Sequence, residues 1–233
     1  MPITTTPDHV AVAVPDIERA AERWHDELGA GWLGDDMERL STPVGIRQMV
    51  FPNGGKLELL QPTGEGFAQA FVDRFGPRIH HVTLKVPDAL LPAVETIREA
   101  GYDVVDVNTE GGWHESFLRP SQVGGLIVQV AWQEKSDEEW FAETGYTPEA
   151  PRGSAALLGP TLTHPDLDTA EHVWTTLGGK ITRTDDVLTV RWDDCPLDIR
   201  IEQGPNAGPV GLRFSGTDAL PAHDAMGPAV LVD

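Results

Sequence analysis

Alternating apolar positions open the chain and return in a second segment further along. Val10, Val12 and Val14 occupy every second position, and His9 has the opposite parity. A period of two residues is typical of a β-strand that turns one face to a core. The segment 82–86 repeats this alternation directly after a second histidine. The sequence therefore predicts two equivalent strands, each with a histidine at its start.

Each predicted strand leads into a segment with helical periodicity. The helices are expected over 17–28 and 88–100, and each stops at a glycine, the residue that most readily ends a helix. Asp16 precedes the first helix and is expected to cap it. Strand-like segments follow in both copies, at 47–51 and 57–60 in the first and at 102–107, 116–118 and 126–131 in the second. The pattern predicts an α+β fold of tandem βαβββ modules that pair into cupped mixed sheets.

Two weaker copies of the pattern fill the C-terminal part of the chain. The segment 162–170 matches 12–20, and a fragment over 210–220 matches 80–90. The intervening stretch is polar and contains Pro and Gly, which predicts a linker with one helical turn. The predicted organisation is a metal-binding domain over 1–132, a linker over 133–154 and a degenerate copy over 155–233.

The composition narrows the classes of partner. The formal net charge is −20, whereas nucleic acids and anionic membranes are bound by basic patches. The sequence shows no apolar run of membrane length and no leader segment. The single cysteine, Cys195, excludes an intramolecular disulfide and fits a reducing compartment. We expect a cytoplasmic protein that acts on a small molecule, without a nucleic-acid or membrane partner.

Four polar side chains recur at matched positions of the first two copies. His9 corresponds to His81, and Glu58 corresponds to Gln129. Parity places all four on the face opposite to their apolar neighbours, whereas His80 has the other parity and is expected on the helix side. A single histidine on a strand is more often a hydrogen-bonded core residue, but four matched residues favour a shared metal site. We therefore expect one divalent ion held by His9, Glu58, His81 and Gln129.

With these residues the chain resembles the vicinal oxygen chelate superfamily, which includes glyoxalase I, methylmalonyl-CoA epimerase, extradiol dioxygenases and bleomycin-resistance proteins. The resemblance covers 7–132 well and 157–232 as a degenerate copy. It rests on the short motifs His9-Val-Ala-Val, Lys56-Leu-Glu58-Leu-Leu, His80-His81-Val-Thr-Leu, and Phe117-Leu-Arg-Pro120 followed by Gly125-Leu-Ile-Val-Gln129. It implies paired βαβββ modules that cup one divalent ion, which polarises two neighbouring substrate oxygens.

Within the superfamily, the pattern is most similar to the methylmalonyl-CoA epimerases and glyoxalase I, with an exchange. In the epimerases the first module supplies a Gln ligand and the second a Glu, whereas here Glu58 comes first and Gln129 second. The epimerases also place an acid–base Glu five residues before a proline of the first module. Counting back from Pro52 gives Arg47, and the same position of the second module is Glu115. The resemblance thus implies that the two modules have exchanged their roles, so that each of the two carboxylates comes from the opposite module to that in the epimerases.

These residues predict a metal-dependent isomerase or lyase that acts on a small enolisable carbonyl substrate. The ion, expected to be Zn, Co, Ni or Mn, would stabilise an enolate. Glu115 is the expected acid–base residue, and Glu58 shares the task if it loosens from the metal. Arg47 and Arg119 are candidates to bind a substrate carboxylate, with surface placement as the alternative.

Two other functions stay open. His9, His81 and Glu58 alone form the two-histidine, one-carboxylate set that suits Fe(II), so a non-haem Fe(II) dioxygenase is the second hypothesis. The third is a non-catalytic small-molecule binding protein of the resistance type, although such relatives typically lack the ligand histidines.

The C-terminal copies keep the scaffold and lose the ligands. Aligned on the repeats, Gly159 replaces His9, Gly211 replaces His81, and the position of Glu58 falls near Arg200. We expect no second metal there. Because two modules can complete a site within one chain, the protein is expected to be a monomer or a homodimer.

Overall fold

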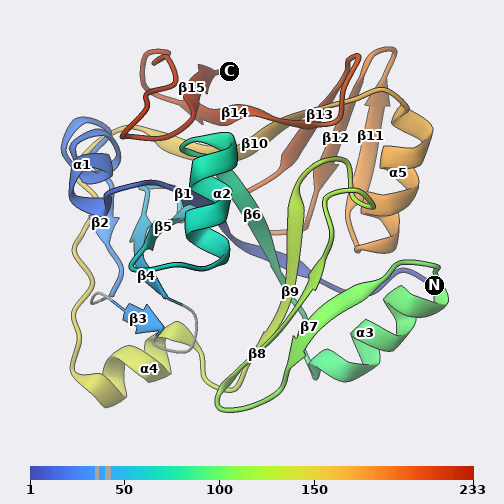
Figure 1. Cartoon of the computed structure of the whole chain (residues 1–233), viewed down its shortest axis with the longest axis horizontal. Coiled ribbons are helices and arrows are strands. Elements are labelled where there is room, and N and C mark those ends of the chain that lie inside the picture. Colours follow the sequence, from blue (N-terminus) through green and yellow to red (C-terminus); the bar gives the residue numbers. More distant parts are fainter. Residues whose placement is uncertain (35–36, 40–42) are drawn as a thin grey trace. The chain divides into compact units, whose positions relative to one another are not determined.

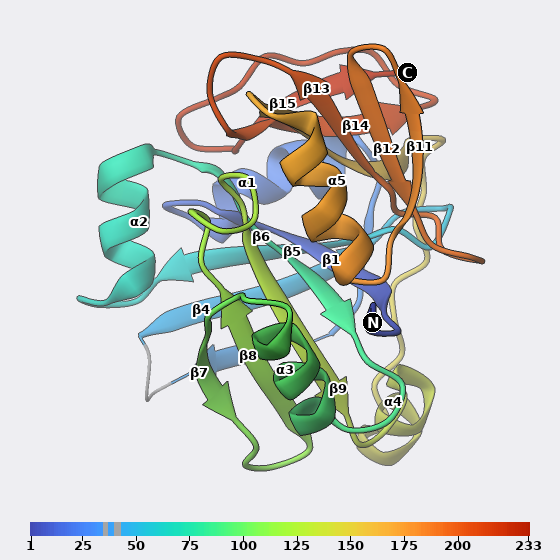
Figure 2. The ribbon, with the colours of Figure 1, turned by 90° about the vertical axis from the view of Figure 1, so that its right-hand side faces the viewer.

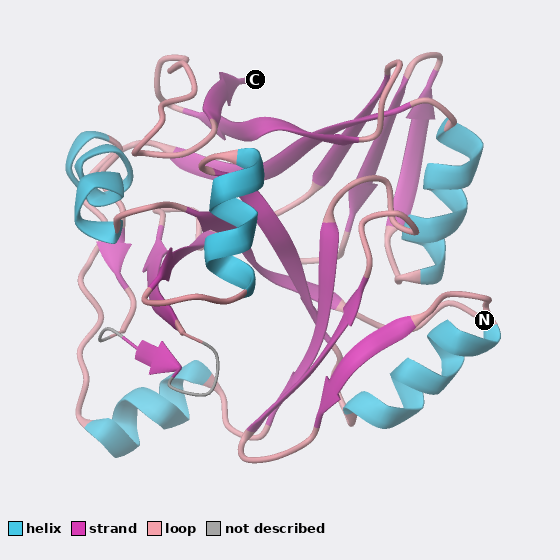
Figure 3. Ribbon diagram, viewed as in Figure 1, coloured by secondary structure: helices cyan, strands magenta, loops and turns pink. Residues whose placement is uncertain are grey.

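The computed structural model describes residues 1–34, 37–39 and 43–233 (Figure 1). The described residues form an α+β fold with two mixed β-sheets, of nine and six strands, and short helices (Figure 3). The predicted α+β class is confirmed. The chain divides into two compact units. Unit 1 consists of Met1–Asp8, His81–Glu139 and Pro160–Val210, and unit 2 of His9–His80, Trp140–Gly159 and Gly211–Asp233.

The first predicted module makes up most of unit 2. Its strands run in the order β2-β4-β5-β1, and β3 pairs with β4. Strands β1 and β5 are parallel, whereas β4 and β5 are antiparallel. Asp16 caps the helix as predicted, because its Oδ1 accepts a hydrogen bond from the backbone N–H of Arg19 at 3.1 Å. The elements are β1 (Thr6–Ala13), α1 (Ile17–Ala21), η1 (Glu22–Glu27), β2 (Gly31–Trp32), β3 (Met37–Arg39), β4 (Val44–Val50) and β5 (Lys56–Pro62).

The helix predicted over 17–28 is not one regular α-helix. It begins as α1 and continues as the π-helix η1. From this wider turn, Arg23 donates a hydrogen bond to the carbonyl of Pro228 at 3.0 Å, and the Trp24 indole donates to the carbonyl of Met226 at 2.8 Å. The π-helix therefore binds the C-terminal segment of the same unit through two side-chain hydrogen bonds. Single π-turns within α-helices are frequently found at functional sites.

The aromatic core of unit 2 joins the first and fourth copies of the repeat. Phe214, on β14 (Gly208–Ser215), stacks on Trp24 with ring centroids 6.1 Å apart and meets the edge of Phe51 at 5.0 Å. All three side chains are fully buried, and burying a side chain of this size stabilises the fold by about 1.5–3 kcal/mol. Strand β14 pairs in parallel with β15 (Ala229–Val232). Copies distant in sequence thus share one core.

Unit 1 contains the second module and the third copy. The second module has the strand order β6-β9-β8-β7, with α3 packed on β7, β8 and β9 (Figure 2). The third copy has the order β11-β12-β13-β10, with α5 on β11, β12 and β13. Among the described residues, no helix is both long and apolar enough to cross a membrane. The elements are β6 (Arg78–Lys85), α3 (Leu90–Glu99), β7 (Val104–Asn108), β8 (Trp113–Leu118), β9 (Ile127–Gln133), β10 (Ala156–His164), α5 (Leu167–Thr176), β11 (Lys180–Thr184), β12 (Val187–Arg191) and β13 (Ile199–Gln203).

The segment predicted as a linker is ordered against the first module. It contains α4 (Asp137–Thr144), and the backbone N–H of Glu149 donates to the carbonyl of Trp32 at 2.9 Å. A Cβ added to Gly31 would lie 2.0 Å from the carbonyl oxygen of Glu149, so only glycine permits this approach. The division of the sequence at 133–154 stays a prediction, because each compact unit draws on both halves of the chain.

Candidate metal centre

His9 and Glu58 face each other from paired strands. The parallel register sets Ala11 of β1 opposite Glu58 of β5, so His9 projects from the same face two residues away. His9 Nε2 lies 3.6 Å from Glu58 Oε2, and the residues are 1% and 7% exposed. A carboxylate withdrawn from water to this extent needs a charge partner. The pair therefore offers one nitrogen and one oxygen that a cation could bind.

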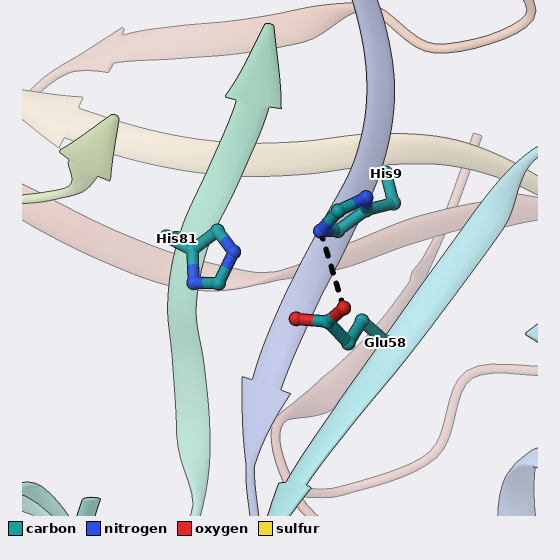
Figure 4. Close-up of side chains that lie close together, drawn as sticks. All are labelled: His9, Glu58 and His81. Atoms are coloured by element: carbon teal, nitrogen blue, oxygen red, sulfur yellow. Dashed lines mark ion pairs between the residues drawn. The ribbon is translucent and has the colours of Figure 1, made fainter. Parts of the chain in front are cut away.

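His81 adds a second imidazole to this pair. It directly follows His80 on β6, and one ligand atom from each of His9, Glu58 and His81 lies within 4.8 Å of the others (Figure 4). Ligands about 2.0–2.2 Å from a tetrahedral ion are roughly 3.4 Å apart, which is near the His9–Glu58 separation. Two imidazoles and one carboxylate are donors that Zn, Co, Ni, Mn and Fe accept. We refer to His9, Glu58 and His81 as the metal-ligand cluster.

Gln48 is a site residue that the sequence did not reveal. It lies opposite Glu58 in the antiparallel β4–β5 register, and its Nε2 donates a hydrogen bond to Glu58 Oε2 at 2.9 Å. A partner that orients a ligand in this way is a general feature of metal sites. Only the cross-strand register identifies such a residue, since ten positions separate it from Glu58 along the chain.

Gln129 and Glu115 form a buried network within unit 1. Gln129 Nε2 donates to Glu115 Oε2 at 2.8 Å, and the indole Nε1 of Trp113 donates to the same oxygen at 3.1 Å. The hydroxyl of Thr83 donates to Gln129 Oε1 at 2.6 Å. Gln129, Glu115 and Thr83 are buried and Trp113 is half-buried. We call these four residues the Gln129 network. The structure thus brings the predicted acid–base residue and the predicted fourth ligand into direct contact.

His80 has the packing role that its parity predicted. Its ring lies 5.6 Å from that of Phe67 and 4.6 Å from that of Phe71, both on α2 (Phe67–Phe75). Burial lowers the pKa of His80 to about 4, against a smaller opposing effect of the nearby Glu58 charge. At neutral pH the ring is therefore an uncharged core side chain.

The two arginines predicted to bind substrate have other surroundings. Arg47 pairs in register with Leu59, on the sheet face away from Glu58. Its guanidinium carbon lies 3.6 Å from the ring centroid of Trp32, and its Nη1 lies 3.2 Å from a carboxylate oxygen of Glu18. Arg119 is exposed just beyond the end of β8. The contacts of Arg47 are those of a surface packing residue.

The register also corrects the alignment of Arg47 with Glu115. Glu115 lies opposite Ala131, two residues beyond Gln129. The matching position of the first module lies opposite Leu60, two residues beyond Glu58, and is Ile46. Counting back from the prolines was wrong by one residue, because Pro52 lies six residues after Ile46, whereas Pro120 lies five residues after Glu115. The first module therefore carries an apolar side chain at this position.

The third copy shows what replaces a ligand. Thr161 of β10 lies opposite Arg200 of β13, as Ala11 lies opposite Glu58 in the first module. The predicted correspondence between Glu58 and Arg200 is confirmed. Arg200 pairs with Glu202 on the same strand at 2.8 Å. An arginine cannot ligate a cation, so this position has changed its chemistry.

Comparison with known proteins agrees with this architecture. Residues 8–117 match the sequence profile of the glyoxalase/bleomycin resistance protein/dioxygenase superfamily. An ethylmalonyl-CoA/methylmalonyl-CoA epimerase from Cereibacter sphaeroides is 35% identical over 129 residues, which are 53% of this chain and 94% of that protein. The similarity to epimerases thus spans about half of the chain.

Solved structures extend the similarity to nearly all of the chain. A hypothetical protein from Staphylococcus aureus superposes with a TM-score of 0.72 at 12% identity, over 99% of both chains. A variant of 4-hydroxymandelate synthase from Streptomyces coelicolor superposes with a TM-score of 0.64 at 14% identity, over 94% of this chain and 72% of that one. At these identities the superpositions show a shared fold alone. Together with the profile match and the epimerase relative, they lead to one conclusion: the chain belongs to the glyoxalase/bleomycin resistance protein/dioxygenase superfamily.

Proposed function

We propose that the chain is a metal-dependent isomerase that epimerises a small CoA thioester at an acidic α-carbon. The observation that carries the proposal is the metal-ligand cluster, which lies inside the segment that matches the superfamily profile. The relative that is 35% identical over this part of the fold is an epimerase of ethylmalonyl-CoA and methylmalonyl-CoA. Substituted malonyl thioesters are therefore the first substrates to test, since two carbonyl groups flank their α-carbon.

The donor set fits a divalent ion. His9, Glu58 and His81 supply two nitrogens and one oxygen, and the amide oxygen of Gln129 is the proposed fourth ligand. A bound ion of this kind supplies Lewis acidity to a neighbouring carbonyl oxygen, which makes the adjacent C–H more acidic. Gln48 holds one oxygen of Glu58 at 2.9 Å and so limits the rotation of the carboxylate.

Glu115 is the proposed residue that moves the proton. Two N–H donors, from Gln129 and Trp113, orient its buried carboxylate. In its ionised form the carboxylate can take the proton from the α-carbon, and in its protonated form it can return it. Epimerisation also requires that a proton reach the opposite face of the same carbon. Glu58, the other predicted carboxylate, is the candidate for this second task.

Exchange of the α-proton tests the proposal directly. Methylmalonyl-CoA in D₂O should lose its α-proton NMR signal in the presence of the protein, which should contain about one divalent ion per chain. Glu115→Gln should keep the ion and slow the exchange by about 10²- to 10⁴-fold. The exposed Glu110 provides a matched control, since Glu110→Gln should change neither the metal content nor the rate of α-proton exchange. Metal-loaded protein that exchanges no α-proton, or a Glu115→Gln variant with full activity, would refute the proposal.

A second candidate is an Fe(II)-dependent dioxygenase. The observation that favours it is the composition of the metal-ligand cluster, which has two histidines and one carboxylate, the set common to many non-haem Fe(II) oxygenases. Protein reconstituted anaerobically with Fe(II) and then exposed to oxygen and candidate substrates would consume oxygen if this reading holds. α-Proton exchange by zinc-loaded protein, without oxygen uptake by the iron-loaded form, would decide for the isomerase.

A further inference from the structure

Thr83 occupies a fully buried position beside the candidate centre. It lies on β6, two residues after His81 and therefore on the same face of the strand. The parallel β6–β9 register places it directly opposite Gln129, and its hydroxyl lies 2.6 Å from Gln129 Oε1. A side-chain hydroxyl with no exposed surface needs a hydrogen-bond partner, and Gln129 provides one.

The chemistry of the neighbours fixes which end of the Gln129 amide faces which strand. The other end of the amide lies 2.8 Å from Glu115 Oε2. The indole N–H of Trp113 can only donate, so Glu115 Oε2 acts as an acceptor, and the amide atom that faces it is the nitrogen. The oxygen consequently faces Thr83, whose hydroxyl donates to it. Glu115 and Thr83 therefore act as a matched acceptor and donor at the two ends of one amide.

The pairs at the matching positions of the other copies differ from this one. Ala11 lies opposite Glu58 in the first module, and Thr161 lies opposite Arg200 in the third copy. In the fourth copy Arg213 holds the place of Thr83, and Leu231 holds that of Gln129. A carboxylate has the same atom at both ends and needs no neighbour to select one of them. A carboxamide has one oxygen and one nitrogen, and only the oxygen binds a cation. Thus the position opposite the carboxylate carries an alanine, and the position opposite the amide carries a hydroxyl.

We propose that Thr83 is a positioning residue that selects the oxygen of Gln129 as a metal ligand. Its hydroxyl keeps Oε1 on the side of β6, the strand that also carries His81, and leaves Nε2 to orient Glu115. Loss of the hydroxyl lets the amide turn over or rotate away, which weakens both the ligand and the orientation of the acid–base residue. This inference rests on the proposed function for its metal, but the orientation of the amide can be measured without one.

The test compares Thr83→Val, which keeps the shape, with Thr83→Ser, which restores the hydroxyl. Thr161→Val is the matched control, because Thr161 holds the corresponding place opposite Arg200 and is also buried. The first measurement is the ¹H–¹⁵N spectrum of the Gln129 side-chain amide in metal-free protein, assigned with Gln129→Leu. The second is the metal dissociation constant, and the third is the separate effect on kcat and KM.

Thr83→Val should move both Gln129 amide resonances toward those of a free glutamine side chain and raise the metal dissociation constant about 10- to 100-fold. Its kcat should fall more than its KM rises, because the orientation of Glu115 matters only in the chemical step. Thr83→Ser should recover all three properties, and Thr161→Val should change none of them.

Two results would overturn the inference: unchanged Gln129 resonances in Thr83→Val, or a Thr83→Ser variant as impaired as Thr83→Val. Wild-type protein that binds no divalent ion would instead refute the proposed function, together with the ligand role of Gln129. In that case the amide spectra of metal-free protein still decide whether Thr83 fixes the orientation of Gln129.

Discussion

His80 and His81 are adjacent on β6 and leave the strand on opposite faces. The ring of His80 packs against Phe71 of α2, with centroids 4.6 Å apart, whereas His81 belongs to the metal-ligand cluster. Both residues are buried, 6% and 4% exposed. Two histidines on one strand thus have different roles, since His80 packs against a helix and His81 offers a ligand atom. A matched pair of substitutions can separate these roles.

We expect His81→Ala to abolish the binding of divalent ions and to leave the metal-free fold intact. His80→Ala should keep the bound ion and lower the free energy of unfolding by about 1–3 kcal/mol, because it leaves a cavity under α2. Metal analysis and urea unfolding of metal-free protein measure the two effects. Equal metal loss in both variants would contradict the assignment of opposite roles.

Replacing Gln48 should weaken the metal site without changing a ligand. Gln48→Leu removes the N–H that holds Glu58 Oε2 at 2.9 Å, and we expect the metal dissociation constant to rise about 10-fold. Gln61 offers a contrasting variant on the adjacent strand, since its Oε1 accepts a hydrogen bond from the backbone N–H of Ile17 at the start of α1. Gln61→Leu should lower stability and leave metal affinity unchanged. An unchanged metal affinity in Gln48→Leu would show that Glu58 needs no such support.

Parity along single strands was sufficient to predict the metal-ligand cluster. Leu57 and Leu59 flank Glu58, Val10 follows His9 and Val82 follows His81, and all four of these apolar residues are fully buried. The alternation of a strand then fixes the common side of the three ligand residues. Gln48 and Thr83 could not be predicted in this way, because their relation to the site depends on which residue lies opposite them. Cross-strand register depends on which residues pair and not on the distance to a proline, which is why counting from prolines misaligned Arg47 by one residue.

The repeat predicted the elements but not how the copies pack. Helices near 17–28 and 88–100 and the strands that follow them were expected, and all are present. Self-similarity says nothing about which copy shares a core with which. Phe214 lies against Trp24 and Phe51 in unit 2, and this contact between the first and fourth copies follows from packing of large side chains rather than from any local pattern.

Glu149 should give the protein a small acid-dependent contribution to stability. The hydrogen bond from His25, at 2.9 Å, is the main cause that lowers the pKa of this carboxyl below its usual 4.5. A carboxyl with a lowered pKa in the folded state stabilises the fold above its unfolded-state pKa and loses this contribution as the pH falls through the folded-state value. Because Glu149 is partly exposed, we expect the contribution to be below about 1 kcal/mol.

Urea unfolding of wild type and Glu149→Gln at several pH values measures this contribution. The variant should be less stable at pH 7, and the difference should shrink as the pH falls below 4.5. The exposed Glu138 serves as control, since Glu138→Gln should show no such pH-dependent difference. If the difference in the free energy of unfolding between wild type and Glu149→Gln stays constant from pH 7 to the acid range, the effect comes from packing and not from charge.

Salt should accelerate the reaction if the substrate is a CoA thioester. The chain has a formal net charge of −20, and the phosphates of CoA are also negative, so the two repel at long range. Raising the ionic strength from about 0.01 M to 0.1 M shortens the screening length from about 30 Å to 10 Å, and we expect kcat/KM to rise several-fold. If kcat/KM falls instead, a local basic group must attract the substrate. Arg119 is then the first to replace, and Arg119→Gln should raise KM while kcat stays unchanged.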